Sequence, residues 1–161
     1  MAPRTPRWLD DEEMAAWRGL VETFADLSAE LASDLEASHG LTLAEYGTLV
    51  RLSEAPDRRL RMCDLATVLH VSASALTRRI DDMVTRGWVR REPDPADRRV
   101  INAVLTDDGF VVLATAAPDH VMSVRRRLFD HLSRTQVRQL GSILRTLQHA
   151  ATAPTTVDRT A

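Results

Sequence analysis

Hydrophobic residues recur at steps of three and four along a long stretch that follows the first ten positions. They are Met14, Trp17, Leu20, Val21, Phe24, Leu27, Leu31 and Leu35. This spacing places them on one face of a helix, so an amphipathic helix is expected over about 10–38. Asp10 with Glu13 has the spacing of a capping box, and Gly40 is the residue type that commonly ends a helix.

The middle of the chain changes from helical to strand-like spacing. Thr42 with Glu45 has the spacing of a second capping box, which predicts a helix ending near Ser53. Further along, Ser72 is placed to cap a helix that Gly87 closes. The elements expected beyond residue 60 are, in order, helices over about 62–69 and 73–86, strands over about 88–92 and 100–105, and helices over about 107–131 and 135–150.

This order of elements is that of a winged helix-turn-helix, in which two helices precede a hairpin with a charged tip. We therefore expect a mostly α fold with a small β-hairpin (α+β), with residues 41–106 as the winged domain. The flanking helices, 10–40 and 107–150, carry apolar stripes too long for so small a core, which predicts the dimerisation region of a homodimer. Residues 1–9 are expected to form a flexible arm and 151–161 a disordered tail.

Composition places the chain among ordinary globular proteins. It has 161 residues, of which 44% are hydrophobic and 27% are charged, so one domain is expected and the fibrous and fully disordered classes are excluded. No apolar run reaches the roughly 18 residues of a membrane span, and the first residues lack the apolar stretch of a secretory signal. The single Cys63 cannot form an internal disulfide, which favours a reducing, cytoplasmic compartment.

The net charge of -2 hides an uneven distribution of charge. Residues 1–50 carry three arginines against ten acidic residues, whereas residues 51–105 carry eleven arginines against eight acidic residues. The middle of the chain is therefore basic. A local basic surface matters more for contacts with phosphates than the charge of the whole chain, so nucleic acid remains a candidate partner.

The predicted helix over 73–86 has one apolar and one polar face. Its inward stripe consists of Leu76, Ile80 and Met83, and its opposite side presents Ser74, Thr77, Arg78, Asp81, Asp82 and Thr85. Arg78 is long enough to reach the edge of a guanine, and Asp81 is able to accept from the N4 amino group of a cytosine. The alternative interpretation is a solvated polar face on which Arg78 pairs with Asp82.

The predicted hairpin has a basic tip. Arg90 and Arg91 precede the loop Pro93–Asp97, and Arg98 and Arg99 follow it. Arginine is the side chain that enters a narrow minor groove, where the potential of DNA is most negative. Asp97 is placed to hold the guanidinium of Arg99. The alternative is an exposed, charged hairpin tip without a partner.

Six stretches of the chain resemble the multiple-antibiotic-resistance regulator (MarR) family. They are Leu41–Tyr46, Arg61–Ala66, Val71–Arg78, Arg86–Arg90, Asp97–Arg99 and Leu105–Gly109. The resemblance implies a homodimeric winged-helix transcription regulator on a pseudo-palindromic operator, with the terminal helices forming the dimer layer. Members of the family usually repress, and their effectors often lie between the dimer layer and the winged domain.

The resemblance also implies roles for individual residues. The residues expected to contact double-stranded DNA are Ser72, Ser74, Thr77, Arg78, Arg79, Asp97, Arg98 and Arg99. Of these, Ser74, Thr77 and Arg78 would meet the major groove, while Arg79 would reach a phosphate. Arg99 would enter the minor groove beside Asp97, with Arg98 as the alternative for that insertion.

Candidates for other chemistry are few. Trp17, His39 and Tyr46 are candidates for a cleft that takes a small aromatic or phenolic effector, with core packing as the alternative for Trp17. Gly47 stands where the urate-responsive members of the family carry Asp, which argues against urate. Cys63 is interpreted as a half-buried structural residue rather than a redox sensor. The five histidines lack the spacing of a metal site, so neither a metal nor a cofactor is expected.

Two other classes of function remain as alternatives to an operator-binding regulator. A winged-helix adaptor would bind a protein partner through the same surface. An enzyme is not expected, because the sequence has no catalytic triad order, no glycine-rich phosphate loop and no paired carboxylates.

Overall fold

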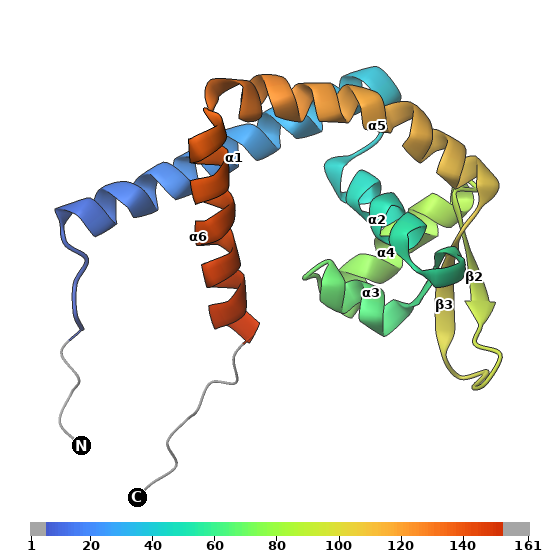
Figure 1. Ribbon diagram of the computed structural model, residues 1–161. Helices are drawn as coiled ribbons and strands as arrows, with labels where there is room; N and C mark the ends of the chain where they lie inside the picture. Colours follow the sequence, from blue (N-terminus) through green and yellow to red (C-terminus); the bar gives the residue numbers. More distant parts are fainter. Residues whose placement is uncertain (1–5, 153–161) are drawn as a thin grey trace, which may run out of the picture. The chain divides into compact units, whose positions relative to one another are not determined.

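The computed structural model describes residues 6–152 (Figure 1). The chain divides after Ser123 into two compact units. Most of the expected arm and tail lies outside the described residues. The first unit contains α1 (Asp11–His39), α2 (Leu43–Glu54), the 3-10 turn η1 (Pro56–Arg58), β1 (Arg59–Arg61), α3 (Met62–Val68), α4 (Ala73–Thr85), β2 (Val89–Pro93), β3 (Ile101–Leu105) and most of α5 (Asp107–Arg127). The second unit contains the end of α5, the 3-10 turn η2 (Phe129–His131) and α6 (Arg134–Thr152).

The helices begin and end where side chains satisfy their free backbone groups. Both predicted capping boxes are confirmed: the N–H of Glu13 donates to Asp10 at 2.8 Å, and that of Glu45 donates to Thr42 Oγ1 at 3.2 Å. Gly40 closes α1 with a left-handed φ of 57°, a conformation that glycine adopts without steric cost. Ser72 caps α4, as predicted, by accepting from a backbone N–H of the first turn.

The sheet has three antiparallel strands in the order β1-β3-β2, one strand more than the predicted hairpin. In the hairpin, Val89 pairs with Leu105 at one end and Pro93 with Ile101 at the other. The added strand is β1, in which Arg59 pairs with Val104. The sequence did not reveal β1 because its three residues, Arg-Leu-Arg, are too few to show alternation, and only their pairing with β3 defines them as a strand.

The core of the first unit joins α2, α3 and α4 to the sheet and to the C-terminal end of α1. The predicted inward stripe of α4 is confirmed, with Leu76, Ile80 and Met83 each no more than 1% exposed. Gly109 lets α5 begin close against the hairpin, because a Cβ there would lie 2.1 Å from the backbone oxygen of Trp88. These contacts set the position of α4 and of the hairpin within one rigid core.

The predicted helix over 107–131 is wrong at its end. α5 stops at Arg127 because Leu128 leaves the helical region, with φ -128° and ψ -67°, and a 3-10 turn follows. α6 then begins after Ser133, whose Oγ accepts from the N–H of Gln136 while its own N–H donates to the Gln136 side chain. α5 therefore ends four residues before the predicted position, and the predicted break between it and the last helix is confirmed.

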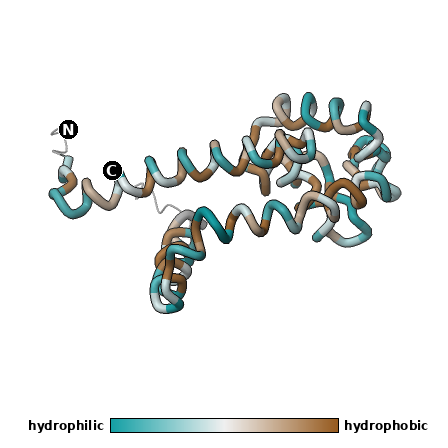
Figure 2. Tube along the Cα trace, turned by 90° about the horizontal axis from the view of Figure 1, so that it is seen from above, coloured by the Kyte–Doolittle hydropathy of each residue, from teal (hydrophilic) through white to brown (hydrophobic). Residues whose placement is uncertain are grey.

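Long helices leave apolar side chains uncovered within the chain. In α1 only Leu31 and Leu35 are buried, whereas Trp17 and Phe24 are 56% and 70% exposed. Figure 2 shows hydrophobic residues recurring along the helices between hydrophilic ones. In α6, considered by itself, Ile143, Leu144 and Leu147 are exposed. Among the described residues, none of these helices has the length and hydropathy of a membrane span.

Candidate nucleic-acid interface

The outer face of α4 is open to solvent while its inner face holds it in the core. Of the residues predicted to contact DNA here, Ser72, Ser74, Thr77 and Arg78 are exposed. Arg79 is half-buried, and its guanidinium donates to Thr48 Oγ1 of α2 at 3.3 Å. The structure thus places the hydroxyls and Arg78 on one accessible face and turns Arg79 toward α2.

Most arginines of the basic segment 51–105 are held by a partner within the chain. Eight of the eleven are paired: Arg51 with Glu54, Arg58 with Asp107, Arg59 and Arg90 with Glu92, Arg61 with Asp94, Arg79 with Thr48, Arg86 with Glu45 and Arg91 with Asp81. Within residues 6–152, the guanidinium groups of Arg78, Arg98 and Arg99 have no such partner, and all three residues are exposed. The free cations of this segment therefore lie on α4 and at the hairpin tip.

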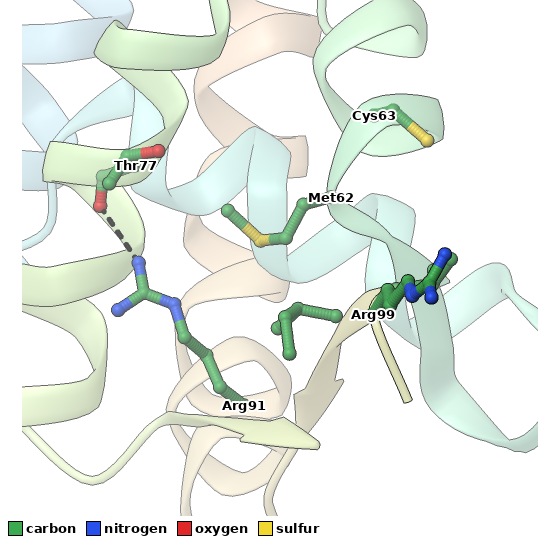
Figure 3. A pocket seen from close by; sticks show the side chains of 7 residues that line it. Met62, Cys63, Thr77, Arg91 and Arg99 are labelled. Atoms are coloured by element: carbon green, nitrogen blue, oxygen red, sulfur yellow. Dashed lines mark hydrogen bonds between the residues drawn. The ribbon is translucent and has the colours of Figure 1, made fainter. Parts of the chain in front are cut away.

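Arg91 connects the hairpin to α4. Its guanidinium contacts the Asp81 carboxylate and donates to the backbone oxygen of Thr77 at 3.2 Å (Figure 3). Asp81 was a candidate for accepting a hydrogen bond from cytosine, but in the structure its carboxylate is paired with the guanidinium of Arg91. Sequence reasoning missed this role of Arg91 because ten residues separate it from Asp81, outside any helical spacing.

An open cavity of about 490 Å³ lies between α3, α4 and the hairpin (Figure 3). It is lined by Met62, Cys63, Thr77, Arg91, Arg99, Val100 and Ile101. Cys63 is exposed, so the expectation that it is half-buried is wrong. It begins a helix of only seven residues, α3, whose buried positions are Leu65 and Ala66, and this leaves its own side chain on the outside.

The predicted contact between Asp97 and the Arg99 guanidinium is absent from the described part of the chain. Asp97 Oδ1 instead accepts from the backbone N–H of Arg99 at 3.0 Å. A carboxylate two residues before an amide readily forms this local turn, which competes with a side-chain pair. Asp97 therefore shapes the backbone of the hairpin tip and leaves the Arg99 side chain free.

Of the three residues proposed for an effector cleft, two contact consecutive residues of α5 and the third lies apart from them. Trp17 precedes His39 by 22 residues on the same helix, roughly 33 Å along its axis. His39 Nε2 lies 3.0 Å from Asp119 Oδ2, and the Tyr46 ring lies 4.4 Å from the ring of His120. His39 and Tyr46 thus meet α5 at the ends of α1 and α2, while Trp17 lies far from them and is not a core residue.

Burial affects two titratable groups at this junction. It raises the pKa of Tyr46 above its usual value and lowers the pKa of His120. His120 Nδ1 is buried and has no hydrogen-bond partner among the residues that the structure describes. The junction is therefore an aromatic and largely neutral contact between α2 and α5. In the part of the chain that the structure describes, no cluster of three or more His, Cys, Asp or Glu could hold a metal ion.

Comparisons with known proteins agree on one family. Residues 39–100 match the family model described as "MarR family". The chain is 36% identical over 78 residues to the HTH-type transcriptional regulator PecS of Dickeya dadantii, an alignment that covers 47% of each protein and so about half the length of that relative.

Solved structures extend the similarity over nearly the whole chain. Sco3205 of Streptomyces coelicolor, a MarR family transcriptional regulator crystallised in complex with DNA, is 40% identical with a TM-score of 0.86, and 92% of each chain is covered. AbsC of the same organism, also a MarR family transcriptional regulator, is 40% identical with a TM-score of 0.85, over 91% of this chain and 98% of that chain. The chain described here therefore belongs to the MarR family of winged-helix transcriptional regulators.

Proposed function

We propose that the chain is a homodimeric repressor that binds a pseudo-palindromic operator in double-stranded DNA. The observation that carries the proposal is the position of the three arginines of segment 51–105 whose guanidinium groups have no partner among residues 6–152. Arg78 projects from the exposed face of α4, and Arg98 and Arg99 lie at the hairpin tip. The family consists of transcription regulators rather than enzymes, and the relative Sco3205 was crystallised with DNA.

Unpaired arginines suit a surface whose partner is phosphate or a base edge. An arginine already paired with a carboxylate would have to break that contact before it met DNA, whereas Arg78, Arg98 and Arg99 need not. In the proposal, α4 enters the major groove with Ser74, Thr77 and Arg78 facing the bases. The hairpin lays Arg99 in the adjacent minor groove, with Arg98 beside it on the backbone.

The proposed dimer would cover the apolar residues that the single chain leaves exposed on its long helices. Trp17, Leu20, Val21 and Phe24 lie on consecutive turns of α1 and are all exposed. A monomer would leave this apolar stripe in water, which is costly. Two copies joined through such helices would present two α4 helices about 34 Å apart, the repeat of successive major grooves on one side of a duplex.

Relief of repression would come from a small aromatic or phenolic effector. The contact of Tyr46 and His39 with α5 offers rings and a polar pair at the junction between the winged domain and the helices that flank it. Such a ligand would act on a dimer that has two geometries, which differ in the separation of their two α4 helices. It changes operator affinity only if it binds these two geometries with different affinity.

Footprinting on the DNA immediately upstream of the chain's own coding sequence, across a salt series, tests the proposal. We expect a protected pseudo-palindrome and an affinity that falls steeply with salt, because bound phosphates release counterions. The slope should become shallower in the double variant Arg98→Ala/Arg99→Ala and stay unchanged in Arg51→Ala. The last variant removes the same kind of charge from a pair outside the interface. No protected region, together with a co-purifying protein, would favour the adaptor instead.

A further inference from the structure

Asp94 opens the hairpin loop, yet its side chain is only 15% exposed among neighbours that are open to solvent. Its Oδ1 accepts from the backbone N–H of Ala96 at 2.9 Å and of Asp97 at 3.4 Å. Its Oδ2 accepts from Asn102 Nδ2 at 3.2 Å. One carboxylate therefore holds two amides of the loop and one side chain of the sheet.

The partners of Asp94 are themselves fixed. Asn102 is 3% exposed in β3 and pairs in register with Arg61 of β1. Arg61 Nε lies 3.9 Å from Asp94 Oδ2, and Arg61 is also the residue that directly precedes α3. Through these contacts the loop is tied to β3 and to the junction of β1 with α3, and not only to its own hairpin.

The loop is closed from its other side as well. The N–H of Asp94 donates to the backbone oxygen of Val100 at 2.8 Å, and the N–H of Val100 donates to that of Asp97 at 2.9 Å. Asp97 in turn accepts from the N–H of Arg99. A chain of hydrogen bonds thus runs from the Asp94 carboxylate to the backbone of Arg99, although the Arg98 and Arg99 side chains have no partner of their own among residues 6–152.

Hydrogen bonds from the backbone of Ala96 and from Asn102 hold the pKa of Asp94 below its usual value. The group is therefore ionised at neutral pH, as an acceptor of several hydrogen bonds should be. A carboxylate this near to a DNA-binding loop would otherwise repel phosphate. Its placement under the loop, turned to amides and to Arg61, gives it a different role.

We propose that Asp94 is a positioning residue for DNA binding, which holds the loop in one conformation so that Arg98 and Arg99 reach the minor groove without prior ordering. The inference rests on the proposed DNA-binding function. Its physical basis is preorganisation: a loop already in its bound conformation loses less entropy on docking than a loose one. Asp94 itself touches no DNA in this proposal.

The direction of the change in DNA affinity in Asp94→Ala distinguishes this positioning role from a purely electrostatic effect. Asp94→Ala removes a negative charge close to the duplex, which by charge alone would strengthen binding. The proposal expects the opposite, a loss of about tenfold in affinity. Asp108→Ala, which removes the same charge from an exposed position on α5, is the matched control and should not weaken binding. Asp94→Asn keeps an acceptor for the two loop amides and should recover most of the affinity.

A double-mutant cycle tests whether Asp94 acts through the arginines. The probe is a fluorescein-labelled duplex of the region upstream of the chain's own coding sequence, titrated with the full-length protein. Asp94→Ala should cost about tenfold in the wild-type background and less than twofold when Arg98→Ala/Arg99→Ala is already present. Equal losses in both backgrounds, or no loss in the first, overturn the proposal.

Amide hydrogen exchange without DNA supplies the second readout. The amides of Ala96 and Asp97 should exchange faster in Asp94→Ala, while amides of α4 and β3 should keep their protection, which separates loop loosening from unfolding. Unchanged exchange at Ala96 and Asp97 contradicts the proposal. Should Asp94→Ala unfold, Pro95→Gly in the exposed loop loosens the same segment and should show the same dependence on Arg98 and Arg99.

Failure of the two proposals gives different results. If the wild-type protein does not bind the duplex, and Arg98→Ala/Arg99→Ala leaves this lack of affinity unchanged, the proposed function is wrong and so is the role of Asp94. If the wild type binds and Arg98→Ala/Arg99→Ala weakens binding while Asp94→Ala does not, only the role of Asp94 falls.

Discussion

The guanidinium of Arg86 donates to the backbone oxygen of Gly40 at 3.1 Å, which joins the C-terminal end of α4 to the C-terminal end of α1. The same group lies 3.9 Å from the buried carboxylate of Glu45 and 4.7 Å from the centre of the Trp88 ring. Gly40 ends the helix that the proposed dimer would use, and α4 is the helix that would enter the major groove. Arg86 therefore connects α1, the helix of the proposed dimer contact, to α4, the helix proposed to enter the major groove.

Arg86→Ala should lower the free energy of unfolding by about 1 kcal/mol, the usual contribution of a charge-assisted hydrogen bond at a partly exposed site. Urea denaturation followed by circular dichroism measures the change. Arg51→Ala, which breaks an exposed pair at the end of α2, should cost less because such pairs contribute little. An equal effect of the two substitutions would remove the structural role of Arg86.

Arg78→Ala should weaken binding to the footprinted duplex by about 1–3 kcal/mol and relax the base preference at the position that it reads. The reason is the loss of a bidentate contact from an arginine that no carboxylate of residues 6–152 holds. Competition with single-base variants of the duplex measures both effects. A uniform loss across all variants would instead assign Arg78 to a phosphate.

The half-buried ring of His120 predicts a pH dependence of stability. Burial lowers the pKa of His120 in the folded chain, so the unfolded chain binds a proton first as pH falls. Its contribution to stability is therefore present above the unfolded pKa near 6.5 and is lost as pH falls below it. Thermal unfolding between pH 7.5 and 5.5 should show a smaller loss in His120→Phe than in wild type. His131→Gln, at an exposed position, is the control.

Phe24→Asp should separate the proposed dimer, because it places a charge in the apolar stripe of α1 where the residue is 70% exposed in the single chain. Light scattering after size exclusion measures the mass, and the same sample should lose most of its operator affinity. Thr23→Asp introduces the same charge at the neighbouring polar position and should leave the mass of the dimer unchanged. A wild-type protein that elutes as a monomer would contradict the prediction.

Local patterns predicted most of the secondary structure because helix periodicity and capping depend on residues only three or four positions apart. The helices, both capping boxes, the Ser72 cap and the hairpin are of this kind. The strand β1 and the early end of α5 are not: one is defined by pairing with β3, and the other by the backbone of a single residue, Leu128.

The sequence by itself determined the family, the winged-helix order and the set of arginines on α4 and the hairpin, since each is a matter of residue type at a given spacing. The tertiary structure decided which of those arginines are free. It paired Arg91 with Asp81, turned Arg79 toward Thr48, and gave Asp97 to a backbone amide. Whether a guanidinium meets a carboxylate or solvent depends on how separate segments pack together, and no short-range pattern in the chain records that.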